Sequence, residues 1–367
     1  MNIPQREVRS ITYPASHVFR GALLGTGQIS VYHLRAWSQI KGVEIVALAN
    51  RTIEKALARA DEFGISPDHV YSDHRELLEG EDLDFVDIAT LPDVHRVQVE
   101  DAAAQGVNVL CQKPMAPSME DAQAMVEACD HAGVLFSINE NWRWRTWYRD
   151  LKRLVEEGAV GKPKYIRIVR HTNLTVPRPG ESLPEFFKDQ PYIMNMERLI
   201  LYEWGIHLID VMRFLFGEVN WVFARMDRTS PISIGEDRAY ITMDVGGVNC
   251  LVDISWGSIG VEKRESQLEQ VTLEGNQGSI ELLPDEADML RISNHEGSRT
   301  QPAFTGTSDD AYQASYTAAQ AHFIGCLREG REPETAARDN IRTLGAMFAS
   351  YESAAENNVI HLQNADS

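Results

Sequence analysis

A glycine-containing turn near the amino end constrains the fold of this chain more than any other feature. The apolar run 18–24 leads into Gly25-Thr26-Gly27-Gln28-Ile29-Ser30, which opens an amphipathic stretch. A strand that turns through glycines into a helix exposes backbone N–H groups at the positive end of the helix dipole, where a dinucleotide pyrophosphate binds. The sequence therefore predicts a dinucleotide site at Gly25, Gly27, Gln28 and Ile29, with a glycine turn that binds nothing as the alternative.

The first part of the chain alternates short apolar runs with amphipathic segments. Strands are expected at 18–24, 43–49, 69–71, 85–89, 107–110 and 134–138, and helices at 29–39, 53–63, 74–78, 94–105 and 119–131. This alternation predicts an α/β fold, a doubly wound parallel sheet with helices on both faces. Residues 18–140 are therefore expected to form a Rossmann domain, after an amino-terminal extension at 1–17.

After residue 140 the pattern changes to consecutive strand-like segments. Strands are expected at 164–171, 219–227, 238–245, 249–256, 269–274, 278–283 and 289–293, and helices at 148–157, 201–216, 311–329 and 336–356. A polar, Pro-rich loop is expected at 172–191. Consecutive strands predict an open, mainly antiparallel sheet. Residues 141–367 are therefore expected to form an α+β domain.

Composition excludes several classes of protein. At 367 residues the chain is too long for one ordinary core, so two domains are expected. The formal net charge of −19 argues against nucleic acid as a partner, because phosphate binding needs a basic surface. Residues 1–17 lack the apolar core of a secretory signal, and the apolar run 199–216 carries ionisable side chains, so no membrane span is expected. The widely spaced cysteines predict neither a disulfide framework nor a metal site. We therefore expect a cytoplasmic protein.

Several polar residues follow the expected strands of the first domain. Asn50 and Arg51 lie where an acidic residue would bind a ribose 2′-hydroxyl, about 20 residues after the glycines. Because neither is acidic and Arg51 is cationic, NADP is favoured over NAD, although Arg51 could also be a solvated helix-start residue. Thr90 and Leu91 follow another strand and face the ligand crevice of such folds. His95, one turn later, contacts the cofactor or packs against its own helix.

Two groups of residues suit proton transfer. Lys113 follows the fifth expected strand, and beside a nicotinamide its pKa would be lowered into the range of acid–base catalysis. Glu203 and His207 are four residues apart on one face of an expected helix, and Asp210 lies on a neighbouring part of that face. A carboxylate beside an imidazole fixes its tautomer and raises its pKa. The alternatives are a surface lysine and a structural acid–histidine pair.

Aromatic and cationic residues are concentrated at 141–148, between the two expected domains. Aromatic faces stack on sugars, and arginines bind carboxylates or phosphates. Most of this cluster is expected to be an interdomain core with extended arginines, with Trp142 and Arg143 as pocket residues. The predicted cofactor contacts include Trp142 and Arg143, together with Gln112 and Lys113.

The chain resembles the glucose–fructose oxidoreductase / inositol dehydrogenase / MocA family of nicotinamide-dependent dehydrogenases over nearly its whole length. The resemblance is carried by Gly25-x-Gly27, Thr90-Leu-Pro92-Asp-Val-His95, Gly106-Val-Asn-Val-Leu-Cys-Gln-Lys113-Pro114, Asn141-Trp-Arg143-Trp144, Gly205-Ile-His207-Leu-Ile-Asp210 and Tyr351-Glu-Ser353-Ala-Ala-Glu. These motifs occur in the family's order and spacing.

The resemblance implies a site in which Lys113 and His207 flank the substrate hydroxyl while hydride passes to the nicotinamide C4. It implies that Glu203 pairs with His207, and that Arg143 and Asp210 join these residues in binding substrate. The substrate would bind between the first domain and the open sheet of the second. The other face of that sheet would form a homo-oligomer, either a dimer or a tetramer. A carbohydrate, polyol or sugar acid is the expected substrate class.

Three departures from the family pattern bear on the substrate. Gln112 replaces the usual glutamate before the lysine, and Glu203 replaces the commoner aspartate. Bulkier residues at 194–198 replace a Gly-rich stretch before the histidine helix. The leading hypothesis is an NAD(P)-dependent oxidoreductase that acts on a secondary alcohol or ketone of a sugar-like molecule. The alternatives are a nicotinamide-dependent glycoside hydrolase that works by transient oxidation and elimination, and a non-catalytic dinucleotide-binding regulator.

Overall fold

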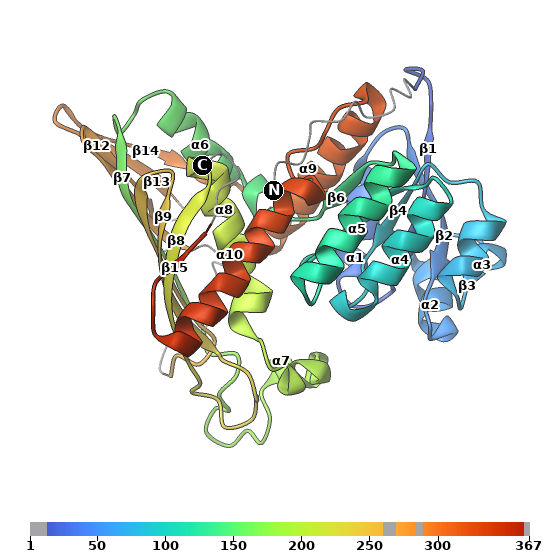
Figure 1. The fold of residues 1–367 in the computed structure, drawn as a ribbon, viewed down its shortest axis with the longest axis horizontal. Coiled ribbons are helices and arrows are strands. Elements are labelled where there is room, and N and C mark those ends of the chain that lie inside the picture. The colour runs from blue at the N-terminus through green and yellow to red at the C-terminus, as the bar shows by residue number, and fades with distance from the viewer. Residues whose placement is uncertain (1–12, 260–268, 284–288, 363–367) are drawn as a thin grey trace. The chain divides into compact units, whose positions relative to one another are not determined.

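The computed structural model describes residues 13–259, 269–283 and 289–362, which form two compact units (Figure 1). The first unit contains residues 13–144 and 312–344, and the second contains residues 145–311 and 345–362. The sequence pattern placed residues 312–344 with the second domain. Side chains from this segment bond to the parallel sheet of the first unit, for example Gln320 Nε2 to Asp87 Oδ2 at 3.4 Å. Such long-range contacts are not visible in a local pattern.

The first unit is built on a six-stranded sheet in the order β3-β2-β1-β4-β5-β6, in which every pairing is parallel. Its strands are β1 (Phe19–Leu24), β2 (Val43–Ala49), β3 (Val70–Tyr71), β4 (Phe85–Ile88), β5 (Asn108–Cys111) and β6 (Phe136–Ile138). Its helices are α1 (Ser30–Gln39), α2 (Ile53–Phe63), η1 (Pro67–His69), α3 (His74–Gly80), α4 (Pro92–Ala104), α5 (Met119–Ala132) and η2 (Asn141–Trp144). The predicted doubly wound parallel sheet is confirmed.

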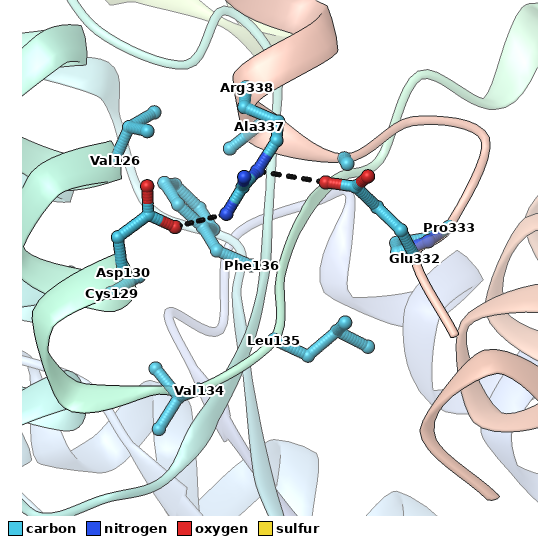
Figure 2. Close-up of a pocket in the computed structure, with 11 residues that line it drawn as sticks. Val126, Cys129, Asp130, Val134, Leu135, Phe136, Glu332, Pro333, Ala337 and Arg338 are labelled. Carbon is cyan, nitrogen blue, oxygen red and sulfur yellow. Dashed lines mark hydrogen bonds and ion pairs between the residues drawn. The ribbon is translucent and has the colours of Figure 1, made fainter. Parts of the chain in front are cut away.

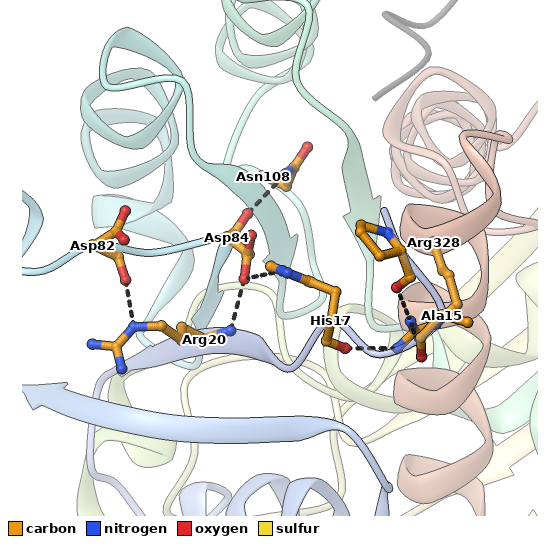
Figure 3. Close-up of polar contacts among 8 residues, drawn as sticks. Ala15, His17, Arg20, Asp82, Asp84, Asn108 and Arg328 are labelled. Atoms are coloured by element: carbon orange, nitrogen blue, oxygen red, sulfur yellow. Dashed lines mark hydrogen bonds and ion pairs between the residues drawn. The ribbon is translucent and has the colours of Figure 1, made fainter. Parts of the chain in front are cut away.

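The described end of the amino-terminal extension is fixed to the start of this sheet (Figure 3). His17 Nε2 and the backbone N–H of Arg20 both bond to Asp84 Oδ2, at 2.9 and 2.8 Å. Arg328 donates to the carbonyl oxygens of Pro14 and His17 at 3.1 and 3.3 Å. These bonds satisfy backbone groups before β1 begins. Residues 1–12 of the predicted extension lie outside the described residues.

The second unit is built on a nine-stranded sheet in the order β14-β13-β12-β11-β7-β10-β9-β8-β15. Only the β7–β10 pairing is parallel among the described strands, which confirms the expected, mainly antiparallel sheet. Its strands are β7 (Pro163–His171), β8 (Val219–Asp227), β9 (Arg238–Val245), β10 (Val248–Ser255), β11 (Gln270–Gly275), β12 (Gly278–Leu283), β13 (Met289–Asn294), β14 (Gly297–Pro302) and β15 (Ile360–His361). The sequence pattern missed β14, because its residues are almost all exposed and do not alternate apolar with polar side chains.

Helices cover one face of this sheet. The helical segments of this unit are α6 (Thr146–Glu156), α7 (Glu185–Asp189), η3 (Pro191–Asn195), η4 (Leu201–Gly205), α8 (Ile206–Phe216) and the end of α10 (Ala337–Glu356). Helix α9 (Ser308–Glu329) starts in this unit, but most of it lies in the first unit. The apolar helix α8 contacts both β9 and β10 (Figure 1). Among the described residues, no helix is both long and apolar enough to cross a bilayer. The expected loop at 172–191 contains α7, which is only one turn long and carries little periodicity.

A buried ion cluster ties the start of α6 to the sheet. Arg145 Nη1 and Arg170 Nη1 donate to Glu269 Oε1 at 2.5 and 2.9 Å, and the Tyr148 hydroxyl donates to Oε2 at 3.1 Å. Burial by itself would raise the pKa of Glu269, but the two guanidinium groups lower it below its usual value. Glu269 therefore stays ionised and supplies one negative charge that both buried guanidinium groups share.

We expect Glu269→Gln to lower the free energy of unfolding by about 3–5 kcal/mol, because it leaves two buried guanidinium groups without their counter-charge. Urea unfolding followed by tryptophan fluorescence would measure the change. Glu281→Gln is the matched control in the same sheet, since its pair with Arg291 is about one-third exposed and should contribute at most about 1 kcal/mol. Equal effects of the two substitutions would contradict this account.

Candidate active site

The first unit gathers its candidate residues at one edge of the parallel sheet. Because all six strands run in the same direction, the residues that follow them meet at the carboxyl edge. The glycine turn follows β1, Asn50 follows β2, Thr90 follows β4 and Lys113 follows β5. Strands β1 and β4 are neighbours although β2 and β3 lie between them in sequence, and the crevice at such a reversal of strand order binds nucleotides in this class of fold.

The geometry of the glycine turn fits a dinucleotide. Gly25 has a φ of +98°, and a Cβ there would lie 2.7 Å from the Ala89 carbonyl oxygen, so a larger residue is excluded. Gly27 is exposed, and a Cβ there would have no described atom within 4 Å, which leaves room for phosphates against the backbone. Ser30, at the third glycine position, is buried and donates from Oγ to the Gly27 carbonyl at 2.5 Å. The first turn of α1 contains no acidic residue that would repel an anion.

Asn50 and Arg51 have different surroundings. Asn50 Oδ1 accepts from the Thr26 backbone N–H at 3.2 Å, and its Nδ2 donates to the Thr52 carbonyl at 2.8 Å. Its side chain therefore braces the glycine turn. Arg51 is exposed at the start of the segment leading to α2.

The residues after β4 include one exposed and one buried candidate. Leu91 is 51% exposed, so an apolar side chain faces outward at this edge. His95 is fully buried, with Nδ1 3.0 Å from the Met115 carbonyl oxygen and Nε2 3.1 Å from that of Thr90. Burial lowers the pKa of His95 despite these contacts. This geometry supports the packing interpretation, and a cofactor contact by His95 stays a prediction.

A buried hydrogen-bond chain leads to Gln112 and Lys113. Asp87 Oδ2 accepts from Trp37 Nε1 at 2.7 Å and from His33 Nδ1 at 2.7 Å. Gln112 Oε1 accepts from the Lys113 backbone N–H at 2.8 Å, so its Nε2 end is the donor toward His33 Nε2 at 3.0 Å. His33 Nε2 must then be an acceptor, which makes the ring neutral. Gln112 thus links a buried network to the backbone of Lys113.

This chain gives a physical reason for the glutamine at position 112. A glutamate there would place a carboxylate oxygen against the lone pair of His33 Nε2 unless the ring took up a proton. The buried hydroxyl group of Tyr316, on α9, also accepts a hydrogen bond from Gln112 Nε2, at 3.3 Å. An uncharged amide therefore suits both neighbours.

Sequence reasoning missed Glu140. It is fully buried, and it lies two residues beyond the end of β6, as Lys113 lies two residues beyond the end of β5. Burial raises the pKa of Glu140 to about 7, while Lys113 and Arg143 act in the opposite direction. The available signal was a polar residue soon after an expected strand of a parallel sheet, the same signal that identified Asn50 and Thr90.

Trp142 and Arg143 are both buried in the first unit. Arg143 Nη1 donates to the Glu334 carbonyl at 3.0 Å, which joins η2 to the segment between α9 and α10. The neighbouring Trp144 ring packs on His322 with centroids 4.6 Å apart. Most of this cluster is therefore structural, as expected, and ligand contacts by Trp142 and Arg143 stay predictions.

The second unit carries Glu203, His207 and Asp210. The single α-helix expected at 201–216 is wrong in its first turn, because Leu201–Gly205 forms the wider π-turn η4 and the α-helix α8 starts at Ile206. Glu203 is partly exposed in the π-turn, whereas His207 and Asp210 are buried on α8. Glu203 and His207 therefore do not share the face of one regular α-helix. Single π-turns inside helices are frequent at functional sites.

Tertiary contacts hold this π-turn. The Arg170 guanidinium lies 3.9 Å from the centre of the Trp204 ring, a cation–π contact, and Trp256 packs edge-on against Trp204 at 5.2 Å. Burial and the nearby Glu203 carboxylate raise the pKa of Tyr192 in η3. The segment before α8 thus brings an aromatic residue close to Glu203. The local sequence pattern could not have indicated that Tyr192 lies close to Glu203.

A separate pocket lies between α5, β6 and the start of α10 (Figure 2). Arg338 bonds to Asp130 on one side and to Glu332 at 2.8 Å on the other. Its lining contains none of the candidate residues named from the sequence. Among the described residues, no cluster of His, Cys, Asp and Glu is arranged to hold a metal ion.

We expect Gln112→Glu to destabilise the protein by about 1–3 kcal/mol at pH 8, because the buried amide donor to His33 is lost. Thermal unfolding at pH 8 would measure this, with the partly exposed Gln123→Glu on α5 as the control. An unchanged melting temperature in Gln112→Glu would contradict this account.

Comparison with known proteins supports these observations. Residues 19–140 match the oxidoreductase family with an NAD-binding Rossmann fold, and residues 148–281 match the GFO/IDH/MocA C-terminal domain. A D-apiose dehydrogenase from Paraburkholderia graminis is 38% identical over 98% of this chain and 94% of its own length. One from Rhizobium rhizogenes is 34% identical over 94% of this chain and 97% of its own length.

Solved structures show the same similarity. The crystal structure of an oxidoreductase from Agrobacterium radiobacter in complex with NAD+, L-tartaric acid and magnesium is 33% identical, with a TM-score of 0.86. The similarity covers 94% of this chain and 98% of that one. The glycine turn, the two-unit fold and these relatives agree, and the chain belongs to the GFO/IDH/MocA family of oxidoreductases.

Proposed function

We propose that this protein is an NAD(P)-dependent dehydrogenase that oxidises a CH–OH group of a sugar, and that D-apiose is its substrate. The observation that carries the proposal is the near full-length similarity to two D-apiose dehydrogenases at 38% and 34% identity. The shape of the glycine turn and the presence of Lys113, Glu203 and His207 support the same chemistry.

The proposed chemistry assigns a role to each of these residues. The nicotinamide, when bound, accepts the hydride from the substrate carbon. Lys113 holds the substrate oxygen by a charge-assisted hydrogen bond. His207, with Glu203, takes the hydroxyl proton during oxidation and returns it during reduction. Arg143 and Asp210 are proposed to orient the sugar.

We propose that NADP is preferred over NAD. Position 50, at the end of β2, carries no carboxylate that would repel a 2′-phosphate, and Asn50 is occupied in bracing the glycine turn. Arg51 is exposed beside it and is available to a phosphate. The Agrobacterium radiobacter oxidoreductase was solved with NAD+, so NAD is the alternative.

We propose a homodimer or homotetramer formed through the nine-stranded sheet, and a location in the cytoplasm. On β8 and β10, partly exposed Trp221, Phe223 and Leu251 alternate with buried residues, so they share the face opposite the buried core. Tyr240 on the intervening β9 is 38% exposed on that face. Aromatic residues of this kind are enriched at protein interfaces.

We expect Lys113→Ala and His207→Ala each to lower kcat by about 10²–10⁴-fold, since the first removes the cation that holds the substrate oxygen and the second removes the proton acceptor. Reduction of added NAD(P)+ with D-apiose and a panel of polyols would be followed by absorbance. Binding of NAD(P)H, measured by fluorescence, should be retained. Unchanged turnover in both variants would reject the assignment. Glycoside cleavage without net reduction of cofactor would favour the hydrolase instead.

We expect Arg51→Ala to weaken NADPH binding by about tenfold and to leave NADH binding nearly unchanged, because it removes a charge-assisted bond to the 2′-phosphate. Fluorescence titration with both nucleotides would measure this. Arg35→Ala, which removes an exposed positive charge from α1, is the control. Tighter binding of NADH than of NADPH by the unaltered protein would reject the NADP preference.

A further inference from the structure

Glu140 and Lys113 occupy equivalent positions after two neighbouring parallel strands. In the β5–β6 register Cys111 is the partner of Ile138, and the Asn139 backbone N–H continues the ladder with a 2.7 Å bond to the Cys111 carbonyl. Each residue lies two positions beyond this pair. Neighbouring strands are about 4.8 Å apart, so the segments that carry the two residues leave the sheet next to each other, and the charge of Lys113 acts on Glu140.

The surroundings of Glu140 point to an ionic partner. Its side chain is fully buried, whereas Lys113 is only half-buried. A buried carboxylate is costly unless cations compensate it. The groups that act on Glu140 are Lys113 after β5, Arg143 on η2 and the amide of Asn340 on α10. Arg143 is buried and donates to the Glu334 carbonyl, whereas Lys113 is half-buried and is therefore the cation nearer to solvent.

The residue next to Lys113 in sequence does not supply a negative charge. Gln112 is neutral, and both ends of its amide are engaged, one with the Lys113 backbone and one with His33. Glu140, in the segment that follows the neighbouring strand β6, is a carboxyl group on which the charge of Lys113 acts.

We propose, on the basis of the proposed function, that Glu140 is a positioning residue for Lys113, whose ammonium group it holds toward the substrate oxygen through an ion pair. When Glu140 takes up a proton from solvent, the ion pair is lost and Lys113 is no longer held. Glu140 does not contact the substrate in this scheme, and no bond to substrate or cofactor is made by it.

Kinetics of three variants test this role. Glu140→Gln keeps the shape but removes the charge, Glu140→Asp keeps the charge, and Glu127→Gln removes an exposed carboxylate on α5 as the matched control. We expect Glu140→Gln to lower kcat at least tenfold with little change in KM, and Glu140→Asp to recover part of this loss. The control should match the unaltered protein. Unchanged kcat in Glu140→Gln would overturn the proposal.

The pH dependence separates positioning from packing. Since the pKa of Glu140 lies at about 7, the carboxylate is present above this pH and lost below it. kcat of the unaltered protein should therefore fall as the pH drops through about 7. In Glu140→Gln the part of this limb that arises from Glu140 should be absent, while any part that arises from protonation of the proposed base His207 should remain. An acid limb that persists unchanged in Glu140→Gln would overturn the role in holding Lys113.

A measurement without turnover keeps this proposal separate from the proposed function. Infrared difference spectroscopy would follow the carboxyl band of Glu140, identified by its absence in Glu140→Gln. In Lys113→Met the protonation midpoint should rise by one pH unit or more, because the stabilising ammonium is gone. An unmoved midpoint would overturn the ion pair. If the unaltered protein oxidises no sugar but the midpoint rises, the proposed function fails and the ion pair stands.

Discussion

Six strands that run in one direction end at one edge, and the arrangement of every candidate residue in the first unit depends on this constraint. The glycine turn, Asn50, Thr90, Lys113 and Glu140 are far apart in sequence, but each follows a strand of the same sheet. Backbone N–H groups at the start of α1 supply the positive end of a helix dipole there. The same edge thus combines an anion site with titratable side chains, although the residues that form them are far apart in the sequence.

Buried charges are handled in two different ways in this protein. Glu269 receives bonds from two arginines and a tyrosine, and it therefore stays ionised with its pKa below the usual value. Glu140 is equally buried, but its cationic neighbours compensate the burial only in part, so its pKa is raised to about 7. The first arrangement suits stability. The second leaves a carboxyl group that changes charge near neutral pH, which is typical of functional sites.

The departures from the family pattern have structural reasons that a single position does not reveal. Gln112 fits because its amide N–H donates to His33 Nε2, while the bond from His33 Nδ1 to the buried Asp87 fixes the tautomer of the ring. Similarly, Glu203 lies in the π-turn η4. The next residue of that turn, Trp204, makes a cation–π contact with Arg170. In both cases a residue far away in sequence decides which side chain or turn is accommodated.

The sequence by itself determined most of the elements and their order, because alternation, periodicity and glycine turns are local properties. Strand β2 and helix α2 have the predicted bounds, and the motifs after β1, β4 and β5 indicated the carboxyl-edge residues. Only the tertiary structure decided what these residues contact. The register that pairs Cys111 with Ile138 puts Glu140 and Lys113 at equivalent positions after neighbouring strands, and hydrogen bonds join α9 to the rest of the first unit. Pairing between distant segments has no signature in a local sequence pattern. The burial and the charge of a side chain depend on which other parts of the chain pack against that side chain.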